Sequence, residues 1–382
     1  MTQSGAKSGG AALKGFQVTN GMDRLSGLVT RHPGGWIKLG NLETRLTAGV
    51  VDPRPVERPI YIAGLARSGS TILLETLARH PEVATHRYRD FPFLFTPYLW
   101  NRWLDLMPRP NERPAERSHA DGITVTSESP EAFEEVLWMA FFPYLHDPSR
   151  SNVLDRSTRH AAFEHFYRDH QRKLLAARRR TRYVAKGNYN VSRLGYLLRL
   201  FPKARIIVPV RDPVWHIASL MKQHALFLRG QDGNPKAARH LRRVGHYEFG
   251  QDRRPMNLGD PAATEEITAL WRSGEELRGW ARYWAQVHHF IADALRHDPA
   301  LRQAVRVVRY EGLCAEPRAN IAGLLAHCGL KAEPAFLDAA ARRFHLPGYY
   351  RPAFNDRELA LIADETGAAA ARFTESAERS VA

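Results

Sequence analysis

Four short apolar runs are spaced along the chain: PIYIAG at 59–64, RYVAKG at 182–187, ARIIVPVR at 204–211 and VRVVRY at 305–310. Each has the length of a strand, and the stretches that follow repeat their apolar residues every three or four positions, which is the helical period. Strands that alternate with helices are typical of βα units around a parallel sheet. The pattern therefore predicts an α/β fold with a central parallel sheet.

The third run ends in a signal for the start of a helix. Arg211 is followed by Asp212 and Pro213, and then by VWHIASLMKQH with helical spacing of its apolar residues. Aspartate is a preferred N-cap residue, and proline suits the first helical position because its missing N–H would have no partner there. We therefore predict that Asp212 caps a helix rather than serving as the aspartate of a Walker B strand.

Two long segments interrupt the alternation of strands and helices. Residues 86–130 are rich in aromatic residues and proline, whereas residues 228–258 are polar and basic. Long irregular segments in a compact domain are usually lids over a site or disordered. The aromatic segment is too apolar for disorder, so we expect it near the site, and both interpretations stay open for the basic one. We predict a main domain over 58–352, a partly disordered extension over 1–57 and a helical tail over 353–382.

The composition is that of a soluble protein that folds without disulfides. The chain has 382 residues, 44% of them hydrophobic, and two cysteines, Cys314 and Cys328. So few cysteines fit a reducing compartment. The first twenty residues lack the apolar core of a signal peptide, and no apolar run of membrane-spanning length occurs. These features lead us to expect a cytoplasmic protein.

The charge balance is strongly basic, with a formal net charge of +15. A basic surface attracts phosphates, anionic substrates, nucleic acid or an anionic membrane surface, and the charge alone does not choose among them. The 17 histidines are scattered, without an H-x-x-x-H pair or a cluster with cysteine. Because metal sites usually show such spacing, we expect no metal site.

The segment GLARSGST at 64–71 follows the first strand and has the glycine and threonine spacing of a phosphate-binding P-loop. Ser70 stands where the P-loop lysine would be, and Arg67 is the nearest cation. Free backbone N–H groups and the helix dipole still attract an anion at such a turn. The missing lysine argues against an ordinary kinase or nucleoside triphosphatase.

Together with two other segments, this loop resembles the sulfotransferases that use 3'-phosphoadenosine 5'-phosphosulfate (PAPS). Their phosphosulfate loop carries a basic residue followed by small and hydroxyl residues, as residues 67–71 do. Residues 201–220, FPKARIIVPVRDPVWHIASL, are similar to the family's 3'-phosphate motif, and residues 307–330 to its downstream strand and helix. The resemblance runs in order from about 58 to 330. It implies a P-loop type three-layer fold and transfer of a sulfonate group by in-line displacement without a metal.

For the loop, the resemblance implies contacts to the 5'-phosphosulfate of PAPS. The backbone amides of Arg67, Ser68, Gly69, Ser70 and Thr71 would wrap this group. The guanidinium of Arg67 and the two hydroxyls at the end of the loop would stabilise its charge. This reading makes Arg67 both a cofactor-binding and a catalytic residue, since the departing phosphate oxygen must be neutralised.

For the second motif, the resemblance implies recognition of the 3'-phosphate by Arg211 and Ser219. An arginine fork and a hydroxyl suit a terminal phosphate dianion. Lys186, at the end of the second strand, is a further candidate for the donor site. A solvated lysine at a strand end is the alternative for that position.

The general base is the least determined part of the site. Protein-sulfating relatives place a glutamate shortly after text similar to HPEV, but here an arginine and a tyrosine occupy that position. Asp90 is the nearest carboxylate and our first candidate, with a salt bridge to a neighbouring arginine as the alternative. His86 is the second candidate, and Glu134 or Glu135 the third, although acidic residues near a helix start often only complement its dipole.

The acceptor is not identified by any motif. Rings at 86–104 would offer apolar surface to a small molecule, a carbohydrate or a lipid-like group, or would simply pack in the core. A basic face would allow peripheral contact with an anionic membrane surface. The alternative functions are a P-loop kinase or nucleoside triphosphatase and a basic nucleic-acid-binding protein, although we expect no nucleic-acid partner.

Overall fold

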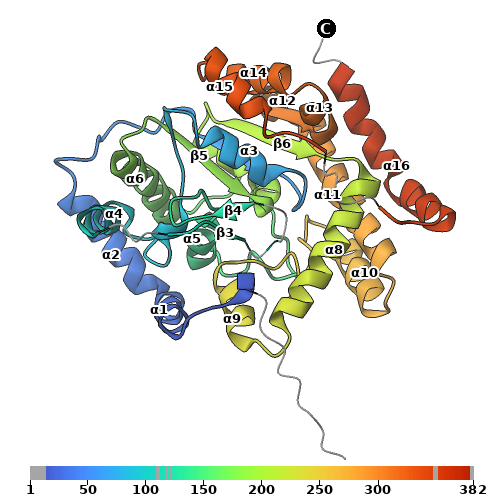
Figure 1. The fold of residues 1–382 in the computed structure, drawn as a ribbon, viewed down its shortest axis with the longest axis horizontal. Coiled ribbons are helices and arrows are strands. Elements are labelled where there is room, and N and C mark those ends of the chain that lie inside the picture. Colours follow the sequence, from blue (N-terminus) through green and yellow to red (C-terminus); the bar gives the residue numbers. More distant parts are fainter. Residues whose placement is uncertain (1–13, 109–111, 118, 120–122, 347–351, 379–382) are drawn as a thin grey trace, which may run out of the picture.

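A five-stranded parallel sheet forms the centre of the molecule, in the order β2-β5-β1-β6-β7 (Figure 1). The computed structural model describes residues 14–108, 112–117, 119, 123–346 and 352–378. The strands of this sheet are β1 (Ile60–Ala63), β2 (Val83–Ala84), β5 (Arg182–Gly187), β6 (Arg205–Val210) and β7 (Val305–Arg309). The predicted parallel sheet is therefore confirmed, and only β2 was not expected, because two residues give no sequence pattern.

Helices cover both faces of this sheet, so the domain has three layers. Ile60 and Ile62 of β1 enter one core with α3, α14 and α15, whereas Tyr61 and Ala63 enter the other with α6, α7, α8 and α11. Successive strand residues point to opposite faces, and β1 is buried on both sides. The helices of the two layers are α3 (Ser70–Leu77), α14 (Pro317–Cys328) and α15 (Pro334–Ala341) on one face, and α6 (Ala161–Arg178), α7 (Leu194–Leu200), α8 (Pro213–Gln231) and α11 (Glu276–His297) on the other.

The helix predicted after the third strand begins where its cap was placed. The carboxylate of Asp212 accepts a hydrogen bond from the backbone N–H of Trp215 at 3.2 Å, at the start of α8. This helix runs to Gln231, so it continues into the basic segment 228–258. The same segment contains α9 (Pro235–Arg243), and it is therefore an ordered part of the fold.

The chain before the sheet also folds onto the domain. Within the extension 1–57, residues 1–13 lie outside the described residues, and α1 (Asn20–Arg31) and α2 (Pro33–Leu46) follow them. The ammonium of Lys173 on α6 fixes α2, because it donates to the carbonyl of Gly40 at 2.8 Å and pairs with Glu43 at 2.9 Å. The aromatic segment 86–130 contributes α4 (Pro97–Leu106) and the small hairpin of β3 (Ala115–Glu116) and β4 (Thr124–Val125).

The remaining elements complete the two helical layers. In the region predicted as a C-terminal tail, α16 packs along α11. No helix in the described part of the chain is both long and apolar enough to cross a bilayer. The elements of the described chain not yet named are the 3-10 helices η1 (Lys14–Phe16), η2 (Tyr88–Asp90) and η3 (Asn188–Arg193), and the helices α5 (Glu134–Phe141), α10 (Pro261–Arg272), α12 (Pro299–Ala304), α13 (Tyr310–Ala315) and α16 (Asp356–Glu378).

Candidate active site

A cavity of about 1340 Å³ opens at the carboxyl ends of the central strands. Residues that directly follow or end β1, β5, β6 and β7 line it, including Ala66, Lys186, Arg211 and Tyr310. The rest of the lining comes from the hairpin β3–β4, the start of α5, and α8 and α9. Ligands of open α/β sheets bind in this position, outside the carboxyl ends of the strands.

The loop between β1 and α3 forms one wall of the cavity and has a constrained backbone. Arg67 and Gly69 both adopt positive φ angles, 71° and 95°. A side chain at Gly69 would bring its Cβ to 2.5 Å from the ring of Tyr310, so this position accepts only glycine. Arg67 holds a left-handed conformation that non-glycine residues rarely adopt, and such backbone conformations concentrate at functional sites. The loop delivers the free N–H groups of the α3 N-terminus to the cavity.

Residues predicted from two separate motifs meet at this loop. The Nε of Arg67 donates to the hydroxyl of Ser219 on α8 at 3.2 Å, across 152 residues of sequence. Arg211 donates to the backbone carbonyl of Arg67 at 3.4 Å, and its guanidinium lies 5.3 Å from the ring centre of Tyr310. The structure thus brings Arg67, Arg211 and Ser219 together on the wall of one cavity.

The other residues predicted for the donor site occupy the same region. Ser68 and Ser70 are buried in the loop, and the hydroxyl of Ser68 has no hydrogen-bond partner among the described residues. Thr71 accepts a hydrogen bond from Arg117 of the hairpin at 3.4 Å. Lys186 lies beside Ile62 in the register of β5 and β1 and lines the cavity.

Charged side chains surround Lys186 in the cavity. Burial lowers the pKa of the Lys186 ammonium, the carboxylates of Glu131 and Glu248 act against that shift, and Arg117 and Arg67 add to it. Because burial disfavours the charged form of Lys186, a nearby negative charge stabilises that form, and an anionic ligand would do the same. The cavity therefore combines anion-attracting groups at the loop with two carboxylates whose charge reaches Lys186.

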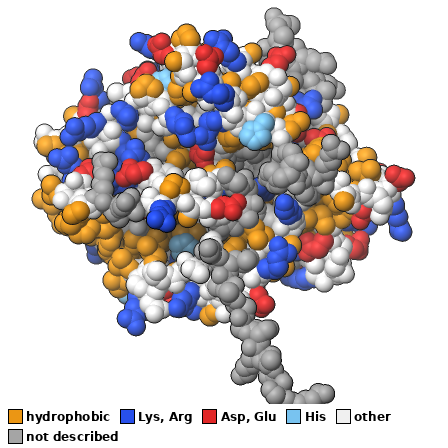
Figure 2. Space-filling model, in the orientation of Figure 1, with side chains coloured by type: hydrophobic (Ala, Val, Ile, Leu, Met, Phe, Trp, Pro, Cys, Tyr) orange, Lys and Arg blue, Asp and Glu red, His pale blue; other side chains and the backbone are white. Residues whose placement is uncertain are grey.

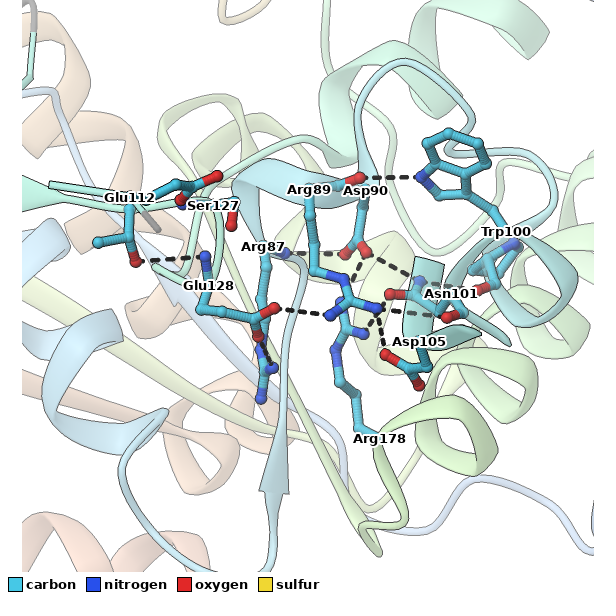
Figure 3. Close-up of polar contacts among 12 residues, drawn as sticks. Arg87, Arg89, Asp90, Trp100, Asn101, Asp105, Glu112, Ser127, Glu128 and Arg178 are labelled. Carbon is cyan, nitrogen blue, oxygen red and sulfur yellow. Dashed lines mark hydrogen bonds and ion pairs between the residues drawn. The ribbon is translucent and has the colours of Figure 1, made fainter. Parts of the chain in front are cut away.

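The two first candidates for the general base lie outside this cavity. Asp90 is fully buried, and its Oδ1 accepts hydrogen bonds from Arg178 at 2.6 Å and from Asn101 at 2.9 Å (Figure 3). Its Oδ2 accepts one from the backbone N–H of Arg87 at 2.8 Å and lies 3.4 Å from Nδ1 of His86. Neither Asp90 nor His86 is among the residues that line the cavity, so the base role predicted for them does not fit the geometry.

The electrostatics of Asp90 are those of a structural ion pair. Burial alone would raise the pKa of its carboxyl, but the hydrogen bond to His86 and the charge of Arg178 outweigh burial and hold it well below its ordinary value. The other nitrogen of His86, Nε2, lies 3.0 Å from His170 in the core. Asp90 thus forms the salt bridge that was the alternative reading, although its partner is Arg178 and not an adjacent arginine.

The third pair of candidates lies at the cavity wall, and both carboxylates already have partners. Glu134 is buried and accepts hydrogen bonds from the hydroxyls of Tyr167 and Tyr183, and burial raises the pKa of its carboxyl. Glu135 forms a bidentate pair with Arg193, at 2.6 and 2.8 Å. Burial raises the pKa of Glu135, but Arg193 and neighbouring groups more than compensate and lower it to about 2. Glu135 cannot take a proton from a ligand without breaking its pair with Arg193. Both tyrosine hydroxyls bind Oε1 of Glu134, and its Oε2 has no hydrogen-bond partner among the described residues, so Glu134 stays a candidate base.

Several side chains of the cavity were not identified from the sequence. Most come from the two long insertions or lie close to them in sequence, where no motif marks them. Burial lowers the pKa of His119 well below its ordinary value, so this ring is neutral. The carboxylate of Glu248 accepts a hydrogen bond from Asn188 at 2.7 Å and lies 3.1 Å from His246. Those that carry charge or can accept a proton include Arg117, His119, Glu131, Lys222, Arg229, His246 and Glu248.

A strand, a glycine loop and a helix, with an arginine and a serine in contact with the loop, form a wall suited to a phosphorylated anion. A protein-family model described as the sulfotransferase family matches residues 59–257. Because this match spans more than half of the 382 residues, the chain belongs to the sulfotransferase family, as its motifs predicted, and is a sulfotransferase. This assignment favours sulfonate transfer over the P-loop kinase alternative.

Solved structures with a similar fold include two mycobacterial sulfotransferases. STF9 from Mycobacterium avium is 16% identical, with 89% of this chain and 81% of that chain covered and a TM-score of 0.46. STF1 from Mycobacterium tuberculosis H37Rv is 14% identical, with 92% and 94% covered and a TM-score of 0.44. The curated proteins include no significant match to the chain.

Proposed function

We propose that the protein transfers the sulfonate group of PAPS to a hydroxyl or amine of an acceptor. The observation that carries the proposal is the contact between the loop residue Arg67 and the α8 residue Ser219, with Arg211 beside them. It joins the two segments that the family resemblance assigns to opposite ends of PAPS. A donor with phosphate groups at both its 5' and 3' positions matches this pair of cationic subsites.

The donor fits the groups on the cavity wall. Backbone N–H groups at the start of α3 and the hydroxyls of Ser70 and Thr71 would hold the 5'-phosphosulfate. Arg67 and Lys186 would neutralise the phosphate oxygen as its bond to sulfur breaks. Arg211 and Ser219 would hold the 3'-phosphate, as the motif predicted. The acceptor oxygen forms the new bond to sulfur, and 3',5'-adenosine bisphosphate leaves.

We propose that the carboxylate of Glu131 is the general base, which accepts the proton that the acceptor loses. The segment 129–131 pairs with 86–88, since Glu131 N–H donates to the carbonyl of His86 at 3.0 Å and Tyr88 N–H to that of Ser129 at 3.1 Å. The carboxylate of Glu131 thus comes from the segment that pairs with residues 86–88, where protein-sulfating relatives carry their glutamate. It lines the cavity, and its charge acts on Lys186. A carboxylate beside the acceptor space is a suitable general base.

The acceptor side of the cavity combines rings, apolar side chains and carboxylates. Phe91, Phe133, Leu226 and Phe249 line it together with Glu131. Rings and carboxylates suit the apolar faces and hydroxyls of a small molecule, a carbohydrate or a lipid-like group. We expect an acceptor of this kind, no metal ion and a cytoplasmic location.

Ligand-dependent stability tests the choice of donor. A ligand that binds only the native state raises the melting temperature by mass action, so 3',5'-adenosine bisphosphate in EDTA should raise it far more than 5'-AMP or ATP. Transfer of labelled sulfonate from PAPS into a cell extract, with mass identification of the product, would then identify the acceptor. Equal or better protection by ATP with magnesium would contradict the proposal.

A further inference from the structure

Exposed hydrophobic side chains are concentrated on and beside two helices, α2 and α4. Leu106 is 81% exposed, Leu46 68% and Trp103 48%, which is unusual for side chains of this size. Single exposed apolar residues are ordinary, but a contiguous group marks an interaction surface. We call this group the α2–α4 face, and its members are Leu39, Leu42, Leu46, Val50, Leu99, Trp103, Leu106 and Met107.

The spacing of these residues places them on one side of each helix. Positions 39, 42 and 46 of α2 share one face, and so do positions 99, 103 and 106 of α4. The two helices are joined, because the backbone N–H of Leu99 donates to the carboxylate of Glu43 at 2.6 Å. Figure 2 shows hydrophobic side chains gathered at the lower left of the view, over the region where Figure 1 draws α1, α2 and α4.

The α2–α4 face rests on a fixed support. Glu43, on the inner side of α2, pairs with the buried Lys173 of α6. On the side of α4, the ring of Trp100 lies 4.9 Å from that of Trp103 and 4.4 Å from that of Phe93. The outer side chains are therefore held outward by a packed interior, and their exposure is a property of the fold.

Cations border the face. Lys38 and Arg45 on α2 and Arg102 on α4 are exposed, and no ion pair joins any of them to a carboxylate among the described residues. Lys38 precedes Leu42 by four residues, and Arg102 precedes Leu106 by four, so each lies next to the apolar side chains on its helix. Asp105, the acidic residue of α4, is engaged by Arg89 at 2.5 Å.

We propose that the α2–α4 face is a docking surface for an anionic lipid bilayer. Helices that lie in a membrane interface carry leucine and tryptophan on one face and lysine or arginine along its border, as this pair does. Anionic head groups would complement the border cations and the net charge of +15. Two helical ridges with outward leucines offer no groove for a peptide. Thr19, the N-cap of α1, and Met22 in its first turn line the cavity, and α1 leads directly into α2.

Flotation with lipid vesicles tests the docking surface in the whole chain. The protein should float with vesicles of equal parts phosphatidylcholine and phosphatidylglycerol, and far less with phosphatidylcholine alone. A triple variant of the face, Leu46→Glu, Trp103→Glu and Leu106→Glu, should lose flotation to background. The matched control, Leu228→Glu with Leu359→Glu, changes exposed leucines of α8 and α16 and should float like the unmodified protein.

The border cations give a second, separable effect. Replacing Lys38, Arg45 and Arg102 with glutamine should lower the partition coefficient on the anionic vesicles roughly 100-fold, at about fivefold for each cation near the surface. The same variant should leave the weak binding to phosphatidylcholine unchanged. The melting temperature and its rise with 3',5'-adenosine bisphosphate should be unaffected in both triple variants, which shows that the fold and the donor site are intact.

Three results would overturn the docking surface. Unmodified protein that does not float with anionic vesicles rules it out. If the face variant and the control float equally well, another part of the surface binds the membrane. If the unmodified protein is a dimer that does not bind vesicles, and the face variant is a monomer, the face is an interface between two copies. None of these results depends on PAPS, so a failure of the docking surface leaves the proposed reaction standing, and a failure of the reaction leaves the docking surface standing.

Discussion

Asp90 and Glu131 are carboxylates on two neighbouring segments that pair with each other, but the fold gives them opposite surroundings. Asp90 is fully buried between Arg178 and Asn101, and both of its oxygens are occupied. Glu131 lines the cavity and faces the charge of Lys186. A carboxylate that is fully satisfied within the protein stabilises the fold, whereas one that opens into a cavity is available to a ligand. The difference separates a structural ion pair from a candidate catalytic group.

The variant with the largest expected effect is Glu131→Gln. General bases contribute about 10²- to 10⁴-fold to turnover, and glutamine keeps the shape of the side chain while removing its basicity. We expect kcat for sulfonate transfer to fall by that factor, with an unchanged melting temperature and an unchanged thermal response to 3',5'-adenosine bisphosphate. The assay is labelled transfer from PAPS to the identified acceptor.

The matched control is Glu128→Gln, because Glu128 lies on the same segment but pairs with Arg87 and Arg89 outside the large cavity. It should keep nearly full turnover. An active Glu131→Gln together with an inactive Glu248→Gln would move the base to the carboxylate held by Asn188 and His246.

Asp90→Asn should act on stability instead of turnover. Asparagine leaves the Arg178 guanidinium buried without its counter-charge, and breaking a buried pair in this way costs about 3–5 kcal/mol of the free energy of unfolding. Thermal or denaturant unfolding would measure the loss, and the protein that remains folded should retain its kcat. Normal stability combined with lost turnover would return the catalytic role to Asp90.

The pH dependence of stability sharpens the same test. The pKa of Asp90 is lower in the folded state than its ordinary value of 3.8. Its contribution to stability is therefore complete above that ordinary value and is lost as the pH falls toward the folded value. The unmodified protein should lose more of its melting temperature below pH 3.8 than Asp90→Asn does.

The contrast between the two carboxylates also explains how much the sequence could predict. The parallel sheet, the loop and the Arg211 and Ser219 pair were predictable because each is encoded in a contiguous strand-to-helix segment with its own spacing. Asp90 was chosen because it is the carboxylate nearest in sequence to the position of the relatives' glutamate, but its ion-pair partner Arg178 comes from α6, 88 residues further along. Glu131 reaches the cavity only because its segment pairs with residues 86–88, and such pairing leaves no pattern in either segment.

The donor side offers a smaller effect on transfer through Arg67→Ala. Removing one preorganised charge contact typically costs about 2.7–4 kcal/mol of transition-state stabilisation, or 10²- to 10³-fold in kcat. The positive φ of Arg67 does not favour alanine, so the melting temperature has to be measured beside the turnover. Arg67→Lys, which keeps a charge at that position, should recover part of the lost turnover. Near-normal transfer by Arg67→Ala would remove the loop from the mechanism.

The variant with the smallest expected effect is Ser219→Ala, which distinguishes the 3'-phosphate part of the donor site from the 5' part. The hydroxyl of Ser219 contacts Arg67 at 3.2 Å, and we place it on the 3'-phosphate of the donor. A hydrogen bond to a charged group contributes about 1.5 kcal/mol, so 3',5'-adenosine bisphosphate should bind roughly tenfold more weakly. Binding of 5'-AMP, which lacks the 3'-phosphate, should not change, and titration calorimetry with both nucleotides measures the difference. An equal loss for both nucleotides would show that Ser219 acts by positioning Arg67 at the 5' side, because only a contact to the 3'-phosphate distinguishes the two ligands.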